Sequence, residues 1–363
     1  MKLPIFYGII FTNGVLTLIL WLYLKKHFRA EKSEATTEAF TCRSIHQYRD
    51  MKQSTNSTRN EKRTSTPKQF FAAKLVNAHF DDYTFVQNPV IKDTGKQTES
   101  ENVILVLVMS DSNVVSKSFR TVLRDAIGNV SIVKKWRLKI LFLIGTNPTE
   151  SSNMMRVKEE SRQFGDIILG DFPDDYLSFT IKTAMAYRWV LQYYAKVKYI
   201  LRITQDVIIN PYNLVNLVES IKTKNPEKDS IIMGLVITGA KPTFNHPRWA
   251  YKSTIPWPPG VPYPPYPAGP AVLSSIAATM AINTAICDTP VIFPDDCYLG
   301  IIAEKTEINP IGLEHFLWSQ GELFLTINEK IRRRKVAIHC RGSPDIMAKA
   351  WKYIQKINRT NKN

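Results

Sequence analysis

Apolar runs typical of buried strands alternate with helical patterns from residue 102 onward, and this alternation limits the possible folds more than any other feature. The expected strands are residues 102–110 (NVILVLVMS), 137–145 (RLKILFLIG), 166–172 (DIILGDF) and 198–203 (KYILRI). The expected helices are residues 117–127, 154–165, 177–195 and 213–223. Such alternation over short turns predicts an α/β fold with a mostly parallel central sheet and helices on both faces.

The tripeptide Thr204-Gln205-Asp206 ends the last of these strands, where RITQDVIIN turns from apolar to polar and back. In sheets of this type, ligands bind beyond the carboxyl ends of the strands. One carboxylate and two neutral hydrogen-bonding side chains are therefore expected at the ligand edge. Polar residues also end strands and start turns, so a turn without a ligand is the alternative.

The amino-terminal segment differs in character from the rest of the chain. Residues 4–24 contain no charged side chain, and a run of this length can cross a bilayer as a helix. We expect residues 1–3 to be a cytoplasmic tail, 4–24 a transmembrane signal anchor, 25–100 a flexible stem with a transitional segment, and 101–363 the folded domain. Basic residues are more frequent after the span than before it, which by the positive-inside rule alone would place the domain in the cytosol.

Charge and cysteine content exclude two classes of function. The net charge of +16 invites a nucleic-acid partner, but no nucleic-acid-binding motif accompanies it, so we expect none. No Cys-x-x-Cys spacing indicates zinc. Cys42 lies in the expected stem; two of Cys287, Cys297 and Cys340 could pair in a secretory lumen, although the connectivity stays open. His339 is expected to be a packed residue rather than a ligand.

Five sequence blocks between residues 119 and 305 carry a resemblance to a known family. In order they are FRTVLRDAIG, EESRQFGDIILGDFPDDYLSFTIKT, RITQDVIIN, YPPYPAGPAVLS and FPDDCYLGIIAEK. Their order and spacing resemble the β-1,3-glycosyltransferases, which include galactosyltransferases, N-acetylglucosaminyltransferases and their Fringe relatives. Ala126 and Ile127 stand where that family has Thr and Trp, and Thr204 and Gln205 stand where it has aspartates.

The resemblance implies a GT-A-like nucleotide-sugar-binding domain in a single-pass type II Golgi membrane protein, with the catalytic domain in the lumen. It outweighs the topology that charge alone favours. It further implies inverting transfer of a hexose or N-acetylhexosamine from a UDP-sugar, in β-1,3 linkage, to a glycan acceptor on a glycoprotein or glycolipid. The donor sugar and the acceptor stay open. The alternatives are a catalytically inactive relative that binds glycan or a partner enzyme, and a basic membrane-tethered protein without a nucleotide site.

By the resemblance, Asp206 is the metal ligand of the donor site. Mn²⁺ or Mg²⁺ would neutralise the departing diphosphate, and such hard cations prefer oxygen ligands. Thr204 and Gln205 remove two carboxylates, which should weaken metal binding, although Gln205 can still hydrogen-bond the donor. A weaker metal site, a metal-independent enzyme and a loss of catalysis therefore all stay open.

Asp295 and Asp296 in FPDDCYLG are the candidate catalytic residues. A carboxylate within reach of an acceptor hydroxyl can take its proton as that oxygen attacks the anomeric carbon. The resemblance favours Asp296 as this base. The same pair can also cap the helix that follows.

Further donor-side candidates lie in the first two blocks. Arg120 and Arg124 are four residues apart on one helix face, where they could contact a diphosphate together or form surface ion pairs. Asp171 and Lys182 are candidates from the second block. Lys182 either faces the donor pocket or is a solvated helix residue.

The segment RWAYKSTIPWPPGVPYPPYPAGPAVLSS is the candidate acceptor region. Its prolines favour extended and turn conformations, and its aromatic rings offer flat apolar faces on which sugars can stack. We expect a helix over AVLSSIAATMAINTA, residues 271–285. Gly269 is a further acceptor-side candidate, because a glycine permits a close backbone approach or a positive φ. The acceptor candidates are Trp249, Trp257, Tyr263, Tyr266 and Gly269.

Overall fold

The computed structural model describes residues 41–47, 80–89, 102–128, 130–146, 151–224, 229–253, 256–318 and 324–360. The expected tail, signal anchor and most of the stem lie outside these ranges. Within them, none of the helices combines the length and the apolar character that a membrane span requires.

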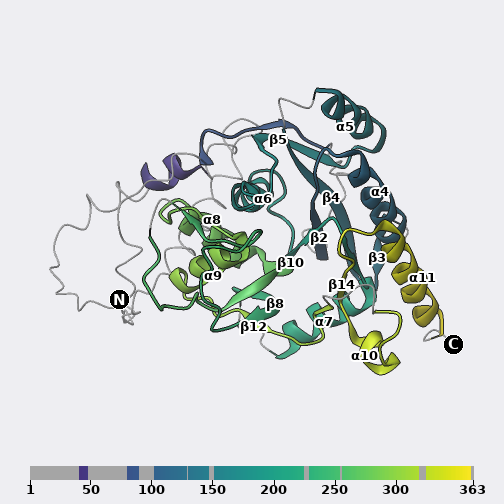
Figure 1. Ribbon diagram of the computed structural model, residues 1–363. Coiled ribbons are helices and arrows are strands. Elements are labelled where there is room, and N and C mark those ends of the chain that lie inside the picture. Colours follow the sequence, from purple (N-terminus) through teal and green to yellow (C-terminus); the bar gives the residue numbers. More distant parts are fainter. Residues whose placement is uncertain are drawn as a thin grey trace, which may run out of the picture.

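A nine-stranded sheet forms the centre of the described structure (Figure 1). Eight strands follow the order β1 (Phe85–Gln87), β5 (Ile167–Pro173), β4 (Trp136–Thr146), β2 (Asn102–Met109), β6 (Tyr199–Thr204), β10 (Tyr266–Ser275), β8 (Ile232–Ile237) and β12 (Ile311–Gly312). The ninth, β3 (Ile132–Val133), pairs with β4. The run β5-β4-β2-β6 is parallel, as the sequence predicts.

Strand β10 interrupts this parallel arrangement, because it pairs antiparallel with both β6 and β8. The sheet is therefore mixed. The predicted helix over residues 271–285 is wrong for its first five residues, which complete β10; helix α8 (Ile276–Ile286) begins after Ser275. The Ser275 hydroxyl accepts a hydrogen bond from the Ala278 amide, and this cap sets the start of the helix.

Helices cover both faces of the sheet (Figure 1). One face carries α4 (Val114–Leu123), α5 (Ser151–Phe164) and α11 (Pro344–Thr360), and the other carries α6 (Phe179–Tyr193), α8 and α9 (Asp295–Lys305). In β2, Ile104 and Val106 join the core under the first group, whereas Leu105 and Leu107 join the core under α6. Burial on both faces explains why this strand is a continuous apolar run.

The remaining described elements include two small sheets, one of which joins a strand of the carboxyl-terminal part to the strand that follows β6. They are η3 (Arg124–Gly128), a π-helical turn after α4, α7 (Pro211–Lys224), α10 (Glu329–Arg334), a small sheet of β9 (Lys252–Ser253) and β11 (Ile292–Phe293), and a second in the order β13 (Leu317–Trp318), β14 (Ala337–His339) and β7 (Val207–Ile209). In the second sheet, His339 pairs with Val207, which begins β7 three residues after the end of β6.

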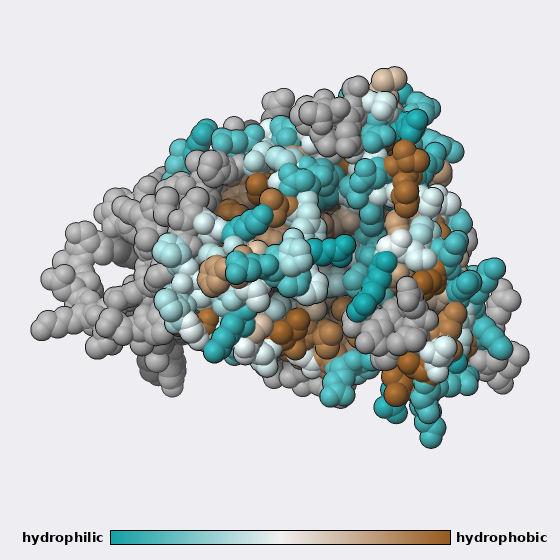
Figure 2. Space-filling view, viewed as in Figure 1, coloured by the Kyte–Doolittle hydropathy of each residue, from teal (hydrophilic) through white to brown (hydrophobic). Residues whose placement is uncertain are grey.

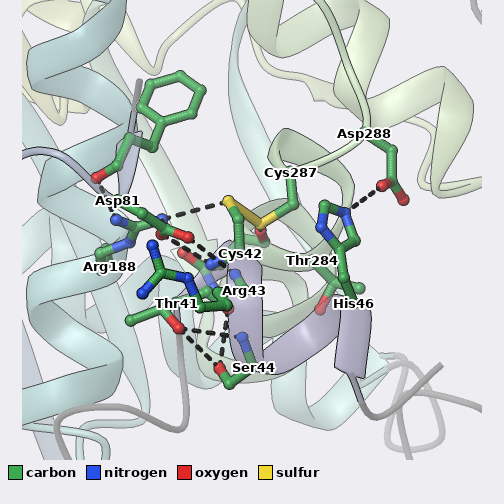
Figure 3. The surroundings of a disulfide bond; sticks show 12 residues. Thr41, Cys42, Arg43, Ser44, His46, Asp81, Arg188, Thr284, Cys287 and Asp288 are labelled. Carbon is green, nitrogen blue, oxygen red and sulfur yellow. Dashed lines mark hydrogen bonds and ion pairs between the residues drawn. A yellow bond between two sulfur atoms is a disulfide. The ribbon is translucent and has the colours of Figure 1, made fainter. Parts of the chain in front are cut away.

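Residues 41–47 and 80–89, which both belong to the expected stem, pack against the domain. Residues 42–47 form a short helix, and Cys42 forms a disulfide with Cys287, 245 residues away in the sequence (Figure 3). The pairing that the sequence left open therefore joins a stem cysteine to a domain cysteine, and Cys297 and Cys340 are buried free thiols.

Polar contacts reinforce this attachment (Figure 3). Asp81 accepts hydrogen bonds from the Cys42 and Arg43 amides at 2.8 Å, and it pairs with Arg188 of α6 at 3.0 Å. His46 lies 2.8 Å from the Asp288 carboxylate. The segment around residue 42 is thus held to α6 and to the end of α8.

The face shown in Figure 2 is mainly hydrophilic, with apolar side chains in separate patches. Scattered apolar side chains are ordinary on protein surfaces. The hydropathy of this face therefore does not mark a functional site.

Candidate active site

The ends of β2 and β6 meet at the carboxyl edge of the parallel part of the sheet. Met109 pairs with Thr204 across the two strands, and the Gln205 amide donates to the Met109 carbonyl at 3.1 Å. Ser110 and Gln205, which follow these paired residues, are therefore neighbours. This is the edge at which a ligand is expected.

The Gln205 carboxamide is held at both ends. Its Oε1 accepts a hydrogen bond from Ser110 Oγ at 2.8 Å, and its Nε2 donates to Asp111 Oδ2 at 3.1 Å. The other Asp111 oxygen accepts from the Asn113 amide and the Ser116 hydroxyl. A carboxylate at position 205 would face the Asp111 carboxylate, so a neutral amide suits this edge.

Asp206 has hydrogen-bond partners for both carboxylate oxygens. Thr204 Oγ1 donates to Oδ1 at 2.7 Å, and His339 Nε2 and the Gly342 amide lie 2.9 Å from Oδ2. Burial raises the pKa of Asp206, but the hydrogen bond and charge of His339 and the hydrogen bond from Thr204 outweigh burial and hold the pKa below its usual value. Asp206 is therefore an ionised carboxylate at neutral pH.

His339 is a site residue that sequence reasoning missed. Its imidazole is 23% exposed and faces Asp206, rather than being a fully packed side chain. Its position depends on the pairing of β14 with β7, which joins segments 130 residues apart and has no local sequence signal.

Asp206 and His339 fit part of a divalent-cation site. Adjacent ligands of an octahedral cation with bonds of about 2.1 Å lie about 3 Å apart, which is close to the 2.9 Å between His339 Nε2 and Asp206 Oδ2. These two atoms share a hydrogen bond here, so His339 could ligate a cation only after Nε2 gives up that proton. No cluster of three or more His, Cys, Asp or Glu side chains that could hold a metal occurs in the part of the chain that the structure describes.

Arg120 and Arg124 form buried ion pairs, which corrects both expectations for them, diphosphate contact and surface pairing. Arg120 is 1% exposed and donates to Glu160 through Nε and Nη2 at 2.8 and 2.7 Å. Arg124 pairs with Glu160 at 2.7 Å and with Asp166 at 2.8 Å. Burial raises the pKa of Glu160, but the two arginines outweigh it and lower the pKa. Arg120 still supports the edge, because its Nη1 donates to Ser110 Oγ at 2.9 Å.

Lys182 and Asp171 also contact protein groups. Lys182 is 2% exposed, so it is not a solvated helix residue; its ammonium group donates to the Ser110 carbonyl and to Asp174 at 2.5 Å. It supports the end of β2 from within the domain. Asp171 accepts hydrogen bonds from the Thr84 amide and hydroxyl at 2.6 and 2.7 Å, which ties the segment before β1 to β5.

Asp295 and Asp296 open helix α9 in different surroundings. Asp295 is buried, with Oδ2 lying 3.0 Å from Arg202 Nη1 and 3.1 Å from Thr183 Oγ1. Asp296 is half-buried, and its Oδ2 accepts from the Gly269 amide at 3.3 Å. Burial and the adjacent Asp295 charge raise the pKa of Asp296 to about 6, against the opposite effects of backbone hydrogen bonds and Arg202. Exposure and pKa therefore make Asp296 the better candidate for a general base.

Gly269 meets these carboxylates through its backbone. It is not among the described glycines with positive φ. A Cβ at this position would lie 3.6 Å from Asp296 Oδ2 and 3.7 Å from Asp295 Oδ1, which is ordinary van der Waals contact, so neither expected reason for a glycine applies here. At Gly300 of α9, a Cβ would come within 2.7 Å of Tyr266 Cβ, so this glycine allows the helix to pack closely on β10.

Three of the four aromatic acceptor candidates are buried. Trp257, Tyr263 and Tyr266 belong to the hydrophobic cluster that includes residues of α8 and α9, so the prediction that their rings stack on a sugar is wrong. Trp249 differs, because it is 57% exposed and stacks on His246 with ring centroids 4.4 Å apart.

Tyr176 is a second exposed ring that sequence reasoning did not select, although it belongs to the second block. It packs edge-on against Phe293 at 5.3 Å. Burial raises the pKa of Tyr176, a hydrogen bond with Trp249 lowers it, and the charges of Asp295 and Asp296 raise it further. These interactions bring Tyr176 near the exposed Trp249 ring, the two carboxylates and Arg248.

The chain matches the family model described as galactosyltransferase over residues 118–314. It is similar to beta-1,3-galactosyltransferase 1 of Homo sapiens, with 26% identity over 254 residues that cover 69% of this chain and 74% of that protein. It is also similar to UDP-GlcNAc:betaGal beta-1,3-N-acetylglucosaminyltransferase 7 of Rattus norvegicus, with 28% identity over 225 residues that cover 59% and 54% of the two chains. Among solved structures, the WbbM bifunctional glycosyltransferase in its apo form matches 74% of this chain and 52% of that chain, with 12% identity and a TM-score of 0.40.

Proposed function

This chain belongs to the galactosyltransferase family, and from that premise we propose that it is an inverting glycosyltransferase. It transfers a hexose or N-acetylhexosamine from a UDP-sugar to a glycan acceptor and forms a β-1,3 linkage. Both similar proteins carry β-1,3 in their names but differ in the sugar, which supports the linkage and leaves the donor sugar open. Family membership and the mixed sheet with helices on both faces support a GT-A-like domain.

The observation that carries the proposal is that strand β6 connects two carboxylate sites of opposite character. At its end lies Asp206, whose pKa is lowered. Within the strand, Arg202 pairs with Asp295, next to Asp296, whose pKa is raised to about 6. Carboxyl groups whose surroundings shift their pKa values in opposite directions suit different roles, one binding charge and the other moving a proton.

Asp296 is the general base in this mechanism. Its carboxylate takes the proton from an acceptor hydroxyl while that oxygen forms a bond to the anomeric carbon and the bond from that carbon to the diphosphate breaks. Attack from the face opposite the diphosphate inverts the anomeric configuration. With a pKa of about 6, Asp296 is mostly ionised at neutral pH and basic enough to accept the proton.

The β2–β6 edge is the donor side. Gln205 and Asp111 offer hydrogen-bonding groups to the nucleotide, and Asp206 with His339 would hold Mn²⁺ or Mg²⁺. Such a cation, when bound, neutralises the diphosphate as it leaves. The exposed ring of Trp249, next to Tyr176, is the acceptor side.

We place the protein in the Golgi membrane, with residues 4–24 as a type II anchor and the domain in the lumen. The Cys42–Cys287 disulfide supports this location, because disulfides persist in oxidising compartments.

Transfer assays with the full-length chain test the proposal, since residues 41–47 are part of the domain. The protein is incubated with UDP-galactose, UDP-N-acetylglucosamine or UDP-N-acetylgalactosamine and a panel of glycans, with and without Mn²⁺. Asp296→Asn should abolish transfer and keep UDP binding by calorimetry. Asp345→Asn, an exposed position on α11, should change neither.

The outcomes separate the candidate functions. Transfer with a β-1,3 product supports the proposal, and absence of UDP binding rejects it. UDP binding without transfer to any glycan would indicate an inactive relative. On the acceptor side, Trp249→Ala should raise the acceptor KM without changing UDP affinity. Trp249→Phe should keep the acceptor KM close to the wild-type value, because a flat ring remains.

A further inference from the structure

Arg202 is a fully buried cation that is not among the candidate site residues, although the RITQDVIIN block begins with it. It lies on β6 two residues before Thr204 and is 0% exposed. Its Nη1 donates to Asp295 Oδ2 at 3.0 Å and to Thr183 Oγ1 at 3.3 Å, and its Nη2 donates to the Gly269 carbonyl at 3.2 Å. A buried guanidinium needs such partners, because an unpaired charge in the interior is costly.

Two of the groups that Arg202 holds bear on Asp296. Asp295 is its chain neighbour, and the Gly269 amide donates to Asp296 Oδ2 at 3.3 Å. Arg202 thus acts on the carboxylate of Asp296 in two ways. It offsets the charge of Asp295, and it holds the Gly269 backbone whose amide donates to Asp296.

Arg202 is the cation that is hydrogen-bonded to Asp295, and its charge also acts on Asp296. Asp295 raises the pKa of Asp296, and Arg202 lowers it. Arg248 is a second cation in these surroundings, because it lowers the pKa of Tyr176. Four further titratable groups interact with Asp296: Cys297 on α9, Tyr263 and Tyr266 beside and on β10, and Tyr176 before α6. All four have raised pKa values, so they are uncharged at neutral pH.

We propose that Arg202 is a positioning residue for the catalytic base: it offsets the negative charge of Asp295 and anchors Gly269, so that the carboxylate of Asp296 stays aimed at the acceptor hydroxyl. The part that concerns catalysis rests on the proposed transferase function. Arg202 lies on β6, two residues before its last residue Thr204, whereas Asp206 lies in the turn that follows the strand.

The test compares Arg202→Met, Arg202→Lys and Thr183→Val in the full-length chain. Infrared difference spectroscopy follows the protonated carboxyl band of the Asp295–Asp296 pair against pH, with Asp296→Asn and Asp295→Asn assigning the signal. The same variants are assayed for UDP affinity by calorimetry and for kcat against pH.

In Arg202→Met, the upper protonation midpoint of the pair should rise by about one to three pH units, because both carboxylates lose the nearby cation. With the wild-type midpoint at about 6, kcat at pH 7 should then fall about two- to hundredfold and recover as the pH rises. UDP affinity should stay within about twofold, since Arg202 lies outside the donor edge.

The conservative variants separate charge from position. Arg202→Lys keeps a cation beside Asp295 but lacks the planar fork that also reaches Gly269, so its midpoint should stay near that of the wild type while kcat falls. Thr183→Val removes one hydrogen bond to Asp295 without burying an unpaired charge, and it should raise the midpoint by less than Arg202→Met. Thr183→Val tests the proposal by itself if Arg202→Met does not fold.

An unchanged midpoint in both Arg202→Met and Thr183→Val would overturn the proposal. So would a loss of kcat that is the same at all pH values, because this indicates a purely structural role. If the wild type transfers no sugar, the proposed function fails, while the infrared midpoints still decide whether Arg202 controls the charge of the pair.

Discussion

Replacing Gln205 by Glu should destabilise the protein through the contact with Asp111. Glu has the same shape, so one of its oxygens would take the position of Gln205 Nε2, 3.1 Å from Asp111 Oδ2. Two unit charges at that distance repel by about 1 kcal/mol in water and about 5 kcal/mol at an effective dielectric constant of 20. Both side chains are half-buried, and one hydrogen bond of about 1 kcal/mol is also lost, so we expect a total loss of about 2–4 kcal/mol.

Urea unfolding at pH 7.5 measures this loss, and a double-mutant cycle with Asp111→Asn assigns it to the pair. The double variant should recover most of the stability, because the amide introduced at position 111 can donate to the carboxylate introduced at position 205. Repulsion raises the pKa values of both carboxyls in the folded state, so the loss is present above these values and disappears as the pH falls below about 4, where both are neutral. Equal stability of Gln205→Glu and the wild type at pH 7.5, or the absence of rescue by Asp111→Asn, would refute this reasoning.

Three further predictions concern the base, the disulfide and the buried ion pairs. The kcat/KM of transfer should fall tenfold per pH unit below about pH 6 as Asp296 is protonated, and a pH profile without this limb would exclude Asp296 as the base. Reduction of the Cys42–Cys287 disulfide, which closes a loop of 245 residues, should cost about 5 kcal/mol of stability by loop entropy, measured as a lower urea midpoint in dithiothreitol. Arg120→Met should cost about 3 kcal/mol, because Glu160 loses a buried partner. Calorimetry should show at most a small loss of UDP affinity, because Arg120 reaches the donor edge only through Ser110; a large loss of UDP affinity with little loss of stability would instead support contact between Arg120 and the diphosphate.

The fold illustrates which contacts a local pattern can predict. Strands β2, β4, β5 and β6 and the helices between them follow from apolar periodicity, because a strand buried on both faces must be continuously apolar. The second half of β10 does not follow from it, since AVLSS is equally compatible with a helix, and only its position between β6 and β8 decides its conformation.

At the site, the sequence alone placed Asp206 at the ligand edge and Asp296 at the start of a helix, because strand ends and caps are local features. It could not assign partners. Whether Arg120 contacts a diphosphate or Glu160, and whether His339 is packed or faces Asp206, depends on which distant segments pack together.

The tertiary structure therefore decided what the sequence left open: the Cys42–Cys287 bond, the His339–Asp206 contact and the position of Arg202 between the donor edge and the base. The physical reason is the sequence separation over which each interaction acts. Periodicity and capping act over a few residues, whereas the charge state of a buried carboxyl depends on every group that the folded chain brings within a few ångströms of it.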